Sequence, residues 1–268
     1  MKKVLITCFM LLVGMSSLNA KEISTYLVGK YVDVNTAKEK LTHAGFNVLA
    51  QYKSVKEGVT LIFTDEALKE EARKPKRAHA AILRLFVDKK EKMISITNPI
   101  YFGRAFMQDD YNAKVYEKEL ATLQATFTSL KGSTDKLDED DISGYHFMMG
   151  MPYYEDVNEL GEGTASELLA KLQNYKKGKN VLFTLKLSDE NYLVGYDLAK
   201  RTKKFVKKIG RANAAVLPYC ISIEDGKATA LEAKYYLAIS YPLLSMGQFT
   251  TIATVPGAIA KDLSKPFK

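Results

Sequence analysis

The chain has 268 residues and a formal net charge of +8 at pH 7, and 47% of its residues are hydrophobic. This proportion supplies ample apolar material for one core or for two domains. With only two cysteines, Cys8 and Cys220, the sequence excludes a fold held by several disulfides, so its stability must come from burial of apolar side chains.

Residues 1–20 have the order of regions that is typical of a secretory signal peptide. Lys2 and Lys3 form a short basic start, residues 4–15 are apolar, and small or polar residues follow from Ser16. The apolar run is too short to span a bilayer, which takes about 20 residues. We therefore expect cleavage near Lys21 and an exported chain with no transmembrane segment, periplasmic if the source is a double-membrane bacterium and otherwise secreted.

Residues 21–130 are expected to form the first of two similar α+β units. Residues that favour helix ends and hairpin turns separate its apolar runs. The predicted elements are a strand at 27–29, a helix at 35–43, a strand at 59–64, a hairpin with its polar turn at 88–92, and a closing helix at 113–130.

A polar, acidic linker is expected at residues 131–143, and residues 144–268 are expected to form the second unit. Its predicted elements are a strand that includes 148–150, a helix at 164–175, a strand at 181–184, a hairpin with its turn at 224–227, and a helix at 236–244.

An internal repeat relates the two units. Residues 77–82 (RAHAAI) match residues 211–216 (RANAAV) at an offset of 134 (211 minus 77). Upstream, the strand at 59–64 matches 181–184 at an offset of 122 (181 minus 59). The difference predicts an insertion around residues 191–208 of the second unit. The fold expected from the repeat is two similar domains, each a mainly antiparallel sheet with helices on one face.

A family resemblance rests on residues 58–106. They contain a Leu-Ile-Phe strand, a Leu-Arg-Leu-Phe-Val strand that ends in Asp88, and an Asn-Pro-Ile-Tyr segment at 98–101. In these features the chain resembles the bacterial family named domain of unknown function 302, over most of 24–130 and more loosely over 145–255. The resemblance implies a fold similar to the curved sheet of the TATA-binding protein, and it implies no activity and no catalytic residues.

A methionine-rich segment at residues 145–151 contains a candidate metal site. In a strand, His146 and Met148 would lie on one face. Imidazole and thioether groups suit Cu(I), so these two residues are candidate copper ligands. The alternative is core packing, which the alignment of Met148 with Leu27 favours, because methionine is an adaptable core filler.

Two histidines, His79 and His146, are candidate general bases for an enzyme, for example a hydrolase. No serine or cysteine nucleophile stands in a recognisable elbow, since Cys220 falls within a predicted strand. Walker, dinucleotide-binding and zinc-ligand spacings are absent from the sequence. The sequence therefore predicts no cofactor, and it favours a non-enzymatic protein over the alternative that uses either histidine.

Paired aromatic residues are the candidate ligand-binding residues, because aromatic side chains line many pockets and partner surfaces. They are Tyr101, Phe102, Tyr235 and Tyr236.

The leading hypothesis is an exported, non-enzymatic binding or accessory protein that holds a small apolar ligand or a partner protein between sheet and helices. The basic run from Lys200 to Lys208 is a candidate contact for an anionic surface, with a solvated helix face as the alternative. An exported chain is not expected to bind nucleic acid, and self-association is left open.

Overall fold

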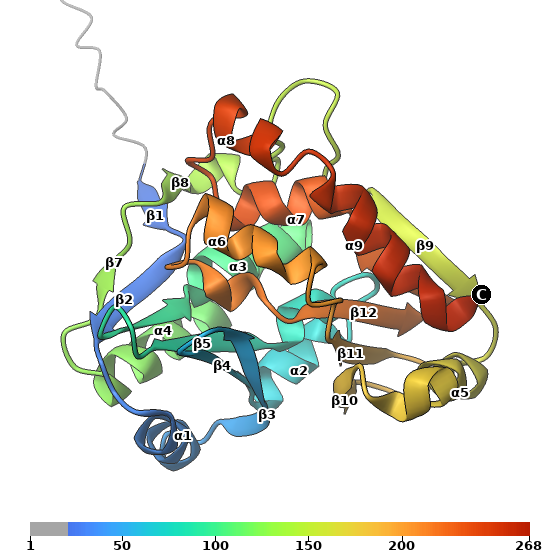
Figure 1. The fold of residues 1–268 in the computed structure, drawn as a ribbon. Coiled ribbons are helices and arrows are strands. Elements are labelled where there is room, and N and C mark those ends of the chain that lie inside the picture. The colour runs from blue at the N-terminus through green and yellow to red at the C-terminus, as the bar shows by residue number, and fades with distance from the viewer. Residues whose placement is uncertain (1–20) are drawn as a thin grey trace, which may run out of the picture.

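A computed structural model describes residues 21–268, so the predicted signal peptide at residues 1–20 lies outside the described residues. The chain is α+β, with three antiparallel sheets flanked by helices, which confirms the predicted fold class. The two larger sheets belong to successive halves of the chain that lie side by side, the first half in blue to green and the second in yellow to red (Figure 1).

The first half, residues 21–143, forms a six-stranded sheet and a small two-stranded sheet. Its strands are β1 (Glu22–Ser24), β2 (Tyr26–Lys30), β3 (Asn47–Val55), β4 (Gly58–Thr64), β5 (Leu83–Asp88), β6 (Met93–Thr97), β7 (Lys131–Gly132) and β8 (Lys136–Asp138). Its helices, with 3-10 helices marked η, are α1 (Val34–His43), α2 (Glu66–Ala72), η1 (Ala78–Ala81), α3 (Pro99–Met107), η2 (Gln108–Asp110), α4 (Ala113–Thr126) and η3 (Glu139–Asp141).

The second half, residues 144–268, forms a five-stranded sheet. Its strands are β9 (Val157–Glu162), β10 (Val181–Lys186), β11 (Tyr192–Tyr196), β12 (Tyr219–Glu224) and β13 (Lys227–Leu231). Its helices are α5 (Ala165–Asn174), η4 (Tyr175–Gly178), η5 (Thr202–Phe205), α6 (Val206–Ile209), η6 (Ala214–Val216), α7 (Ala233–Ser240), α8 (Met246–Thr251), α9 (Val255–Ser264) and η7 (Lys265–Phe267).

The two halves repeat one topology. From edge to edge, the sheets run β3-β4-β5-β6-β2-β7 and β10-β11-β12-β13-β9. With the short β7 set aside, each strand of the first sheet has a counterpart at the same position in the second, and every neighbouring pair is antiparallel. Along the chain, α1 follows β2 and α5 follows the equivalent strand β9, whereas α3 follows β6 and α7 follows the equivalent strand β13.

The repeated topology changes how the halves align. The counterpart of β2 is β9, so the segment around Met148 lies in the loop before the sheet and is not its first strand. Residues 191–208, expected as an insertion, contain β11, η5 and most of α6, and β11 occupies the position of β4. The offset of 122 equated strands from different sheet positions, because short apolar runs resemble one another.

Residues 131–143, expected as a linker, turn back along the first half. Strand β7 pairs with β2, and β8 pairs with β1. Asn213 of the second half donates a hydrogen bond from its side chain to the carboxylate of Asp135 at 2.6 Å. This segment is therefore part of the packed structure, and it lies where the two halves meet.

Local sequence explains where the paired helices begin. Helix α1 starts after Asp33, whose carboxylate accepts hydrogen bonds from the backbone N–H groups of Asn35 and Thr36 at 3.0 and 3.1 Å. Helix α5 starts after Thr164, which forms a capping box with Glu167. The sequence predicts the first of these helix starts at Asn35, two residues after the observed cap, because Asn and Asp are both good capping residues.

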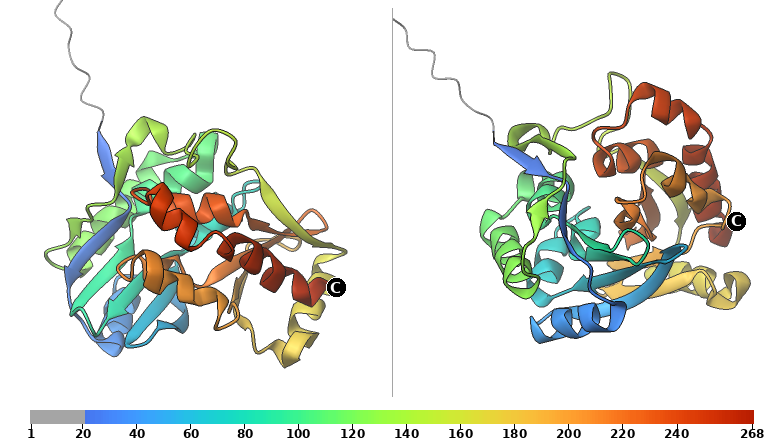
Figure 2. Two further views of the ribbon diagram at one scale, coloured as in Figure 1. Left: turned by 45° about the horizontal axis from the view of Figure 1, so that its top comes forward. Right: turned by 60° about the vertical axis from the view of Figure 1, so that its left-hand side comes forward.

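The two halves pack against each other through α3 and α7. The Tyr101 hydroxyl donates to the Ile239 carbonyl at 2.9 Å, and the Tyr235 hydroxyl donates to the Ala105 carbonyl at 3.1 Å. Tyr235 stands 134 positions after Tyr101, and Ile239 stands 134 positions after Ala105 (235 minus 101, 239 minus 105), so one contact occurs twice with its roles exchanged. Reciprocal contacts define a two-fold interface, so the halves are related by an internal pseudo-two-fold axis. Both views of Figure 2 show the two halves packed side by side.

Candidate functional site

The inner strands β5 and β12 present equivalent side chains to the opposite half. Strand pairing makes Cys220 the counterpart of Arg84 and Glu224 the counterpart of Asp88, an offset of 136 (220 minus 84). Arg84 Nη2 lies 3.4 Å from Cys220 Sγ. Two equivalent positions that touch each other must lie close to the pseudo-two-fold axis, so Arg84 and Cys220 mark the centre of the molecule.

The ends of these strands reach a loop of the opposite half. Asp88 accepts hydrogen bonds from Arg211 Nε and Nη2 at 2.7 and 2.8 Å. Glu224 accepts hydrogen bonds from the backbone N–H of Lys76 at 3.0 and 3.1 Å. Burial raises the pKa of Asp88, but the hydrogen bonds from Arg211 and from the following backbone outweigh it, and the net pKa is lowered. Burial raises the pKa of Glu224.

An open cleft of about 790 Å³, which we call cleft 1, lies beside the Arg211 loop. One wall comes from β2, β6 and β7 of the first half, and the other comes from residues 212–213 of the second half. Its polar lining includes Tyr26, Lys30, Ser95, Lys131, Asp135 and Asn213.

Hydrogen bonds hold the wall of cleft 1 in place, but the buried hydroxyl of Ser95 has no hydrogen-bond partner among residues 21–268. The amide of Asn213 donates to Asp135 at 2.6 Å and to the Ser240 carbonyl at 3.0 Å, and the Tyr26 hydroxyl donates to the same carbonyl at 3.2 Å. Ser95 is 1% exposed, and within residues 21–268 its hydroxyl has no hydrogen-bond partner. Buried hydroxyls are normally paired, so Ser95 has a hydrogen bond to offer a molecule in the cleft.

A second cleft of about 370 Å³, cleft 2, occupies the equivalent place on the second sheet. Strand pairing makes Thr229 the counterpart of Ser95, and the repeat makes His79 the counterpart of Asn213. Both Thr229 and His79 line cleft 2. Each cleft is therefore built from the sheet of one half and the loop of the other, as the pseudo-two-fold axis requires.

The two clefts differ in charge. Cleft 1 is lined by Lys30, Lys131 and Asp135, and neither lysine forms an ion pair within the described part of the chain. Cleft 2 is lined by four acidic and two lysine side chains. These are Glu155, Glu159, Glu224, Asp225, Lys76 and Lys227. Cleft 1 is thus suited to an anionic group, and cleft 2 is not.

At the centre, next to cleft 2, lies a small cavity of about 10 Å³ lined by His79, Arg84 and Cys220, and His79 lines cleft 2 as well. Burial, with the nearby charge of Arg84 as a second cause, lowers the pKa of His79 to about 3, so its imidazole is neutral. Burial raises the pKa of the Cys220 thiol. No hydrogen bond joins the His79 ring to a carboxylate, serine or cysteine within residues 21–268, so it lacks the oriented partner of a general base.

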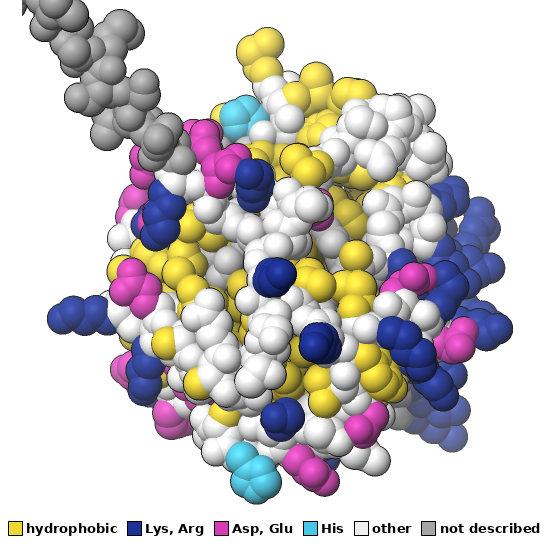
Figure 3. All heavy atoms as spheres, turned by 90° about the vertical axis from the view of Figure 1, so that its left-hand side faces the viewer, with side chains coloured by type: hydrophobic (Ala, Val, Ile, Leu, Met, Phe, Trp, Pro, Cys, Tyr) yellow, Lys and Arg dark blue, Asp and Glu magenta, His cyan; other side chains and the backbone are white. Residues whose placement is uncertain are grey.

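The basic run forms one side of a groove of about 410 Å³, the basic groove. Its lining brings Lys53 and Lys56 of the first half together with lysines of η5, α6 and the preceding loop. The second-half lining residues are Asp197, Lys200, Lys203, Lys204 and Lys207. Lys203 is paired with Asp197 at 2.7 Å. Lys and Arg side chains gather at the right-hand edge of Figure 3, the side that faces the viewer in Figure 1.

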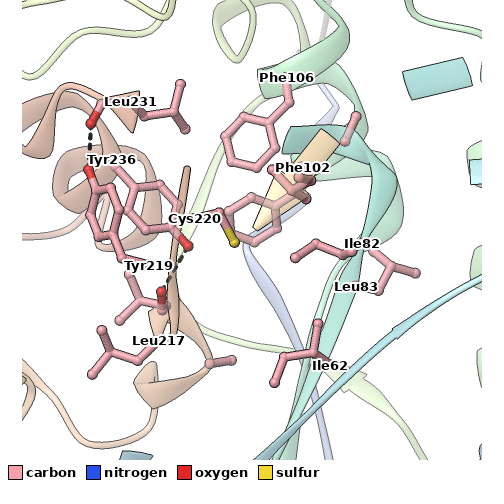
Figure 4. Close-up of a cluster of buried hydrophobic side chains, with 14 of the residues drawn as sticks. Ile62, Ile82, Leu83, Phe102, Phe106, Leu217, Tyr219, Cys220, Leu231 and Tyr236 are labelled. Atoms are coloured by element: carbon pink, nitrogen blue, oxygen red, sulfur yellow. Dashed lines mark hydrogen bonds between the residues drawn. The ribbon is translucent and has the colours of Figure 1, made fainter. Parts of the chain in front are cut away.

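The four aromatic candidates lie inside the molecule. Tyr101, Phe102, Tyr235 and Tyr236 are all 5% exposed or less. Figure 4 shows Tyr219 and Tyr236 of the second half facing Phe102 and Phe106 of the first, with Cys220 between them. Tyr101, Phe102 and Tyr235 line none of the clefts described above, and Tyr236 lines only the central cavity. The contacts of the three tyrosines join the two halves.

The candidate copper residues lie on a loop. The His146 ring lies tilted against the ring of Tyr153 with ring centroids 4.4 Å apart, and Met148 is 44% exposed. The expected strand is absent at this position, so strand alternation does not place His146 and Met148 together. The core-packing alternative is wrong, because Met148 is 44% exposed and Met149 is 93% exposed, whereas Leu27, with which Met148 was aligned, is buried.

Over residues 21–268, no group of three or more His, Cys, Asp or Glu side chains is arranged to hold a metal ion. A pair of His and Met ligands is a different kind of site, so copper binding through His146 and Met148 stays a prediction. No helix among the same residues is long and apolar enough to cross a membrane.

No family model, curated protein or solved structure matches this chain. The resemblance to the family named domain of unknown function 302 therefore stays a prediction, and only the chemistry of the sites themselves points to a function.

Sequence reasoning missed the two polar residues that matter most at the centre and in cleft 1, Arg84 and Ser95. Each interrupts an apolar strand, in Leu-Arg-Leu-Phe-Val and in Met-Ile-Ser-Ile-Thr. A polar residue at an inward position of a buried strand was the available signal. What sequence could not show is that the second half covers this face of the sheet.

Proposed function

We propose that this chain is an exported, non-enzymatic binding protein that holds a small polar molecule with a carboxylate or phosphate group in cleft 1. Its export rests on the signal-like residues 1–20. The observation that carries the proposed ligand site is the buried, unpartnered hydroxyl of Ser95 in a cleft walled by both halves.

The chemistry of cleft 1 fits such a ligand. Lys30 and Lys131 supply positive charge without carboxylate partners among residues 21–268, which favours an anionic group. Ser95 can donate to an acceptor oxygen of the ligand. A volume of about 790 Å³ falls within the roughly 300–1,000 Å³ of small-molecule sites. The wall formed by Asn213 and Asp135 is held by its own hydrogen bonds and is therefore preformed.

The test begins with protein purified from its own host. Native mass spectrometry is expected to show a bound small molecule that is released on unfolding, and calorimetry with that molecule gives its dissociation constant. Loss of one neutral hydrogen bond costs about 0.5–1.5 kcal/mol, so Ser95→Ala is expected to weaken binding roughly two- to tenfold.

The matched control for Ser95→Ala is Thr229→Ala, which removes a hydroxyl from the equivalent position in cleft 2. It is expected to leave the affinity unchanged. Equal weakening by both variants would show that cleft 1 is not the site. Absence of any bound molecule across several growth conditions would count against the binding function itself.

The basic groove supports a second candidate function, contact with an anionic lipid surface. Lys53, Lys56, Lys200, Lys204 and Lys207 line it, and none of the five forms an ion pair within residues 21–268. Each lysine close to an anionic membrane surface contributes about 1 kcal/mol to the free energy of binding. Both halves contribute to the groove, because Lys53 lies on β3 and Lys56 on the turn after it, whereas the other three lysines belong to the second half.

Co-sedimentation with vesicles separates this function from a merely solvated basic face. Binding to vesicles with anionic phosphatidylglycerol is expected to exceed binding to neutral phosphatidylcholine and to fall with salt. The double variant Lys200→Glu with Lys204→Glu is expected to abolish it, whereas Lys114→Glu with Lys118→Glu on exposed positions of α4 makes the same charge change elsewhere. Equal loss with both pairs would leave only a general charge effect.

A further inference from the structure

Arg84 is a buried charge without a counter-charge. The residue is 4% exposed, and within residues 21–268 it forms no ion pair with a carboxylate. Its Nη2 donates to Cys220 Sγ at 3.4 Å, and its Nε has no hydrogen-bond partner. An isolated charge in a protein interior is strongly unfavourable unless it is paired, and an arginine cannot lose its proton there.

The side chain borders a space that could hold a partner. The central cavity has a volume of about 10 Å³, close to the space of one water-sized sphere. Arg84, His79 and Cys220 line it together with aromatic and leucine side chains, and none of its lining residues is acidic. The cavity is therefore small and has one positively charged side chain and no negatively charged one in its lining.

The neighbouring groups do not neutralise Arg84. Burial raises the pKa of the Cys220 thiol, so Cys220 is not an anion at neutral pH. The hydroxyl of Tyr219 donates to the Leu231 carbonyl at 2.6 Å, and that of Tyr236 donates to the Val216 carbonyl at 2.8 Å. Both phenols are thus protonated and use their protons elsewhere, as the dashed lines in Figure 4 show.

We propose that the central cavity binds one halide ion of the size of chloride, held by Arg84 Nε–H on the internal pseudo-two-fold axis. A water molecule would fit the space but would leave the charge uncompensated. Polyatomic anions such as sulfate are too large for a cavity of this volume. Neutral His79 and the Cys220 thiol each have one hydrogen to donate toward the same ion. The site is separate from cleft 1 and does not depend on a ligand there.

Crystallography with bromide tests the site directly. Crystals of the mature chain, residues 21–268, are grown in sodium bromide, and an anomalous difference map is calculated at the bromine edge. We expect a peak in the central cavity within hydrogen-bond distance of Arg84 Nε. A water molecule or an empty cavity at that position, with bromide only at surface sites, would refute the proposal. The result does not depend on any variant folding.

Thermal unfolding tests the energetic consequence. A ligand at a hundredfold excess over its dissociation constant raises the Tm of a chain of this size by about 5 to 10 °C. We expect a saturable rise of this order when chloride replaces gluconate at constant ionic strength. The rise should disappear in Arg84→Met and persist in Arg104→Met, whose arginine is paired with Glu139. A chloride effect of the same size in Arg84→Met would assign it to another site.

Discussion

The reciprocal tyrosines at the interface between the halves are expected to be unequal in their contribution to stability. Tyr101 and Tyr235 make the same contact in opposite directions, and both are buried. The carbonyl of Ala105 also accepts a hydrogen bond from the side chain of Gln108 at 2.6 Å. The carbonyl of Ile239, in the last turn of α7, has the Tyr101 hydroxyl as its side-chain donor, and no second side chain among residues 21–268 donates to it.

Replacement of each tyrosine by phenylalanine therefore has a different cost. Tyr235→Phe removes one hydrogen bond but leaves the Ala105 carbonyl with Gln108, a loss of about 0.5–1.5 kcal/mol. Tyr101→Phe leaves the buried Ile239 carbonyl without a donor, which costs about 1–3 kcal/mol. The ring packing is kept in both variants, so the difference between them reports the unsatisfied carbonyl.

Equilibrium unfolding in urea at pH 7, followed by circular dichroism, measures both free energies of unfolding. We expect Tyr101→Phe to be the less stable variant, with the urea dependence of the free energy unchanged. Tyr153→Phe serves as the control, because its hydroxyl is at the surface and makes only a 3.5 Å contact with His146. Equal losses of unfolding free energy for the two variants, or a larger loss for Tyr235→Phe, would show that the unpaired Ile239 carbonyl does not cause the difference.

Three further predictions concern stability. The pKa of Asp88 is lowered in the folded state, so the pairing of Asp88 with Arg211 stabilises the fold above pH 3.8. This stabilisation is lost as the pH falls through the folded-state pKa. The difference in Tm between wild type and Asp88→Asn should therefore shrink in acid. His79, with its pKa lowered from 6.5 to about 3, binds a proton only in the unfolded state between these values, so the acid loss of Tm below pH 6.5 should be shallower in His79→Gln. A Cβ at Gly103 would lie 2.6 Å from the ring of Tyr116, so Gly103→Ala should lower the free energy of unfolding by about 1–3 kcal/mol. A Cβ at Gly257 in α9 would meet no atom within 4 Å, so Gly257→Ala should raise it by about 0.4–1 kcal/mol. Unfolding in urea measures both changes.

Sequence patterns predicted the local elements better than the pairing between the halves. Helices at 35–43 and 164–175 lie within a residue of α1 and α5, since caps and periodicity are local signals. The β5–β6 and β12–β13 hairpins stand at the predicted turns, and Asp225 and Gly226 have the positive φ that tight hairpin turns require.

Predicting the candidate site residues needed information that no local pattern contains. Tyr101 and Tyr235 looked like pocket residues because aromatic pairs suit pockets, but each is covered by the opposite half. Ser95 and Arg84 looked like ordinary strand residues until the second half was placed over their face of the sheet. Which face of a strand is covered, and by what, depends on tertiary packing between segments more than 100 residues apart, such as Arg84 and Cys220.

The internal repeat itself argues that binding is asymmetric. Contacts that hold the halves together recur in both directions, as for Tyr101 and Tyr235, because either half needs the same support at the pseudo-two-fold axis. At the clefts the equivalent positions differ, with Asn213 where the other half has His79. Cleft 1 is basic and cleft 2 acidic, so one molecule cannot suit both. With two unlike clefts, the duplicated fold is therefore expected to bind one anionic small molecule per chain at its clefts, in cleft 1.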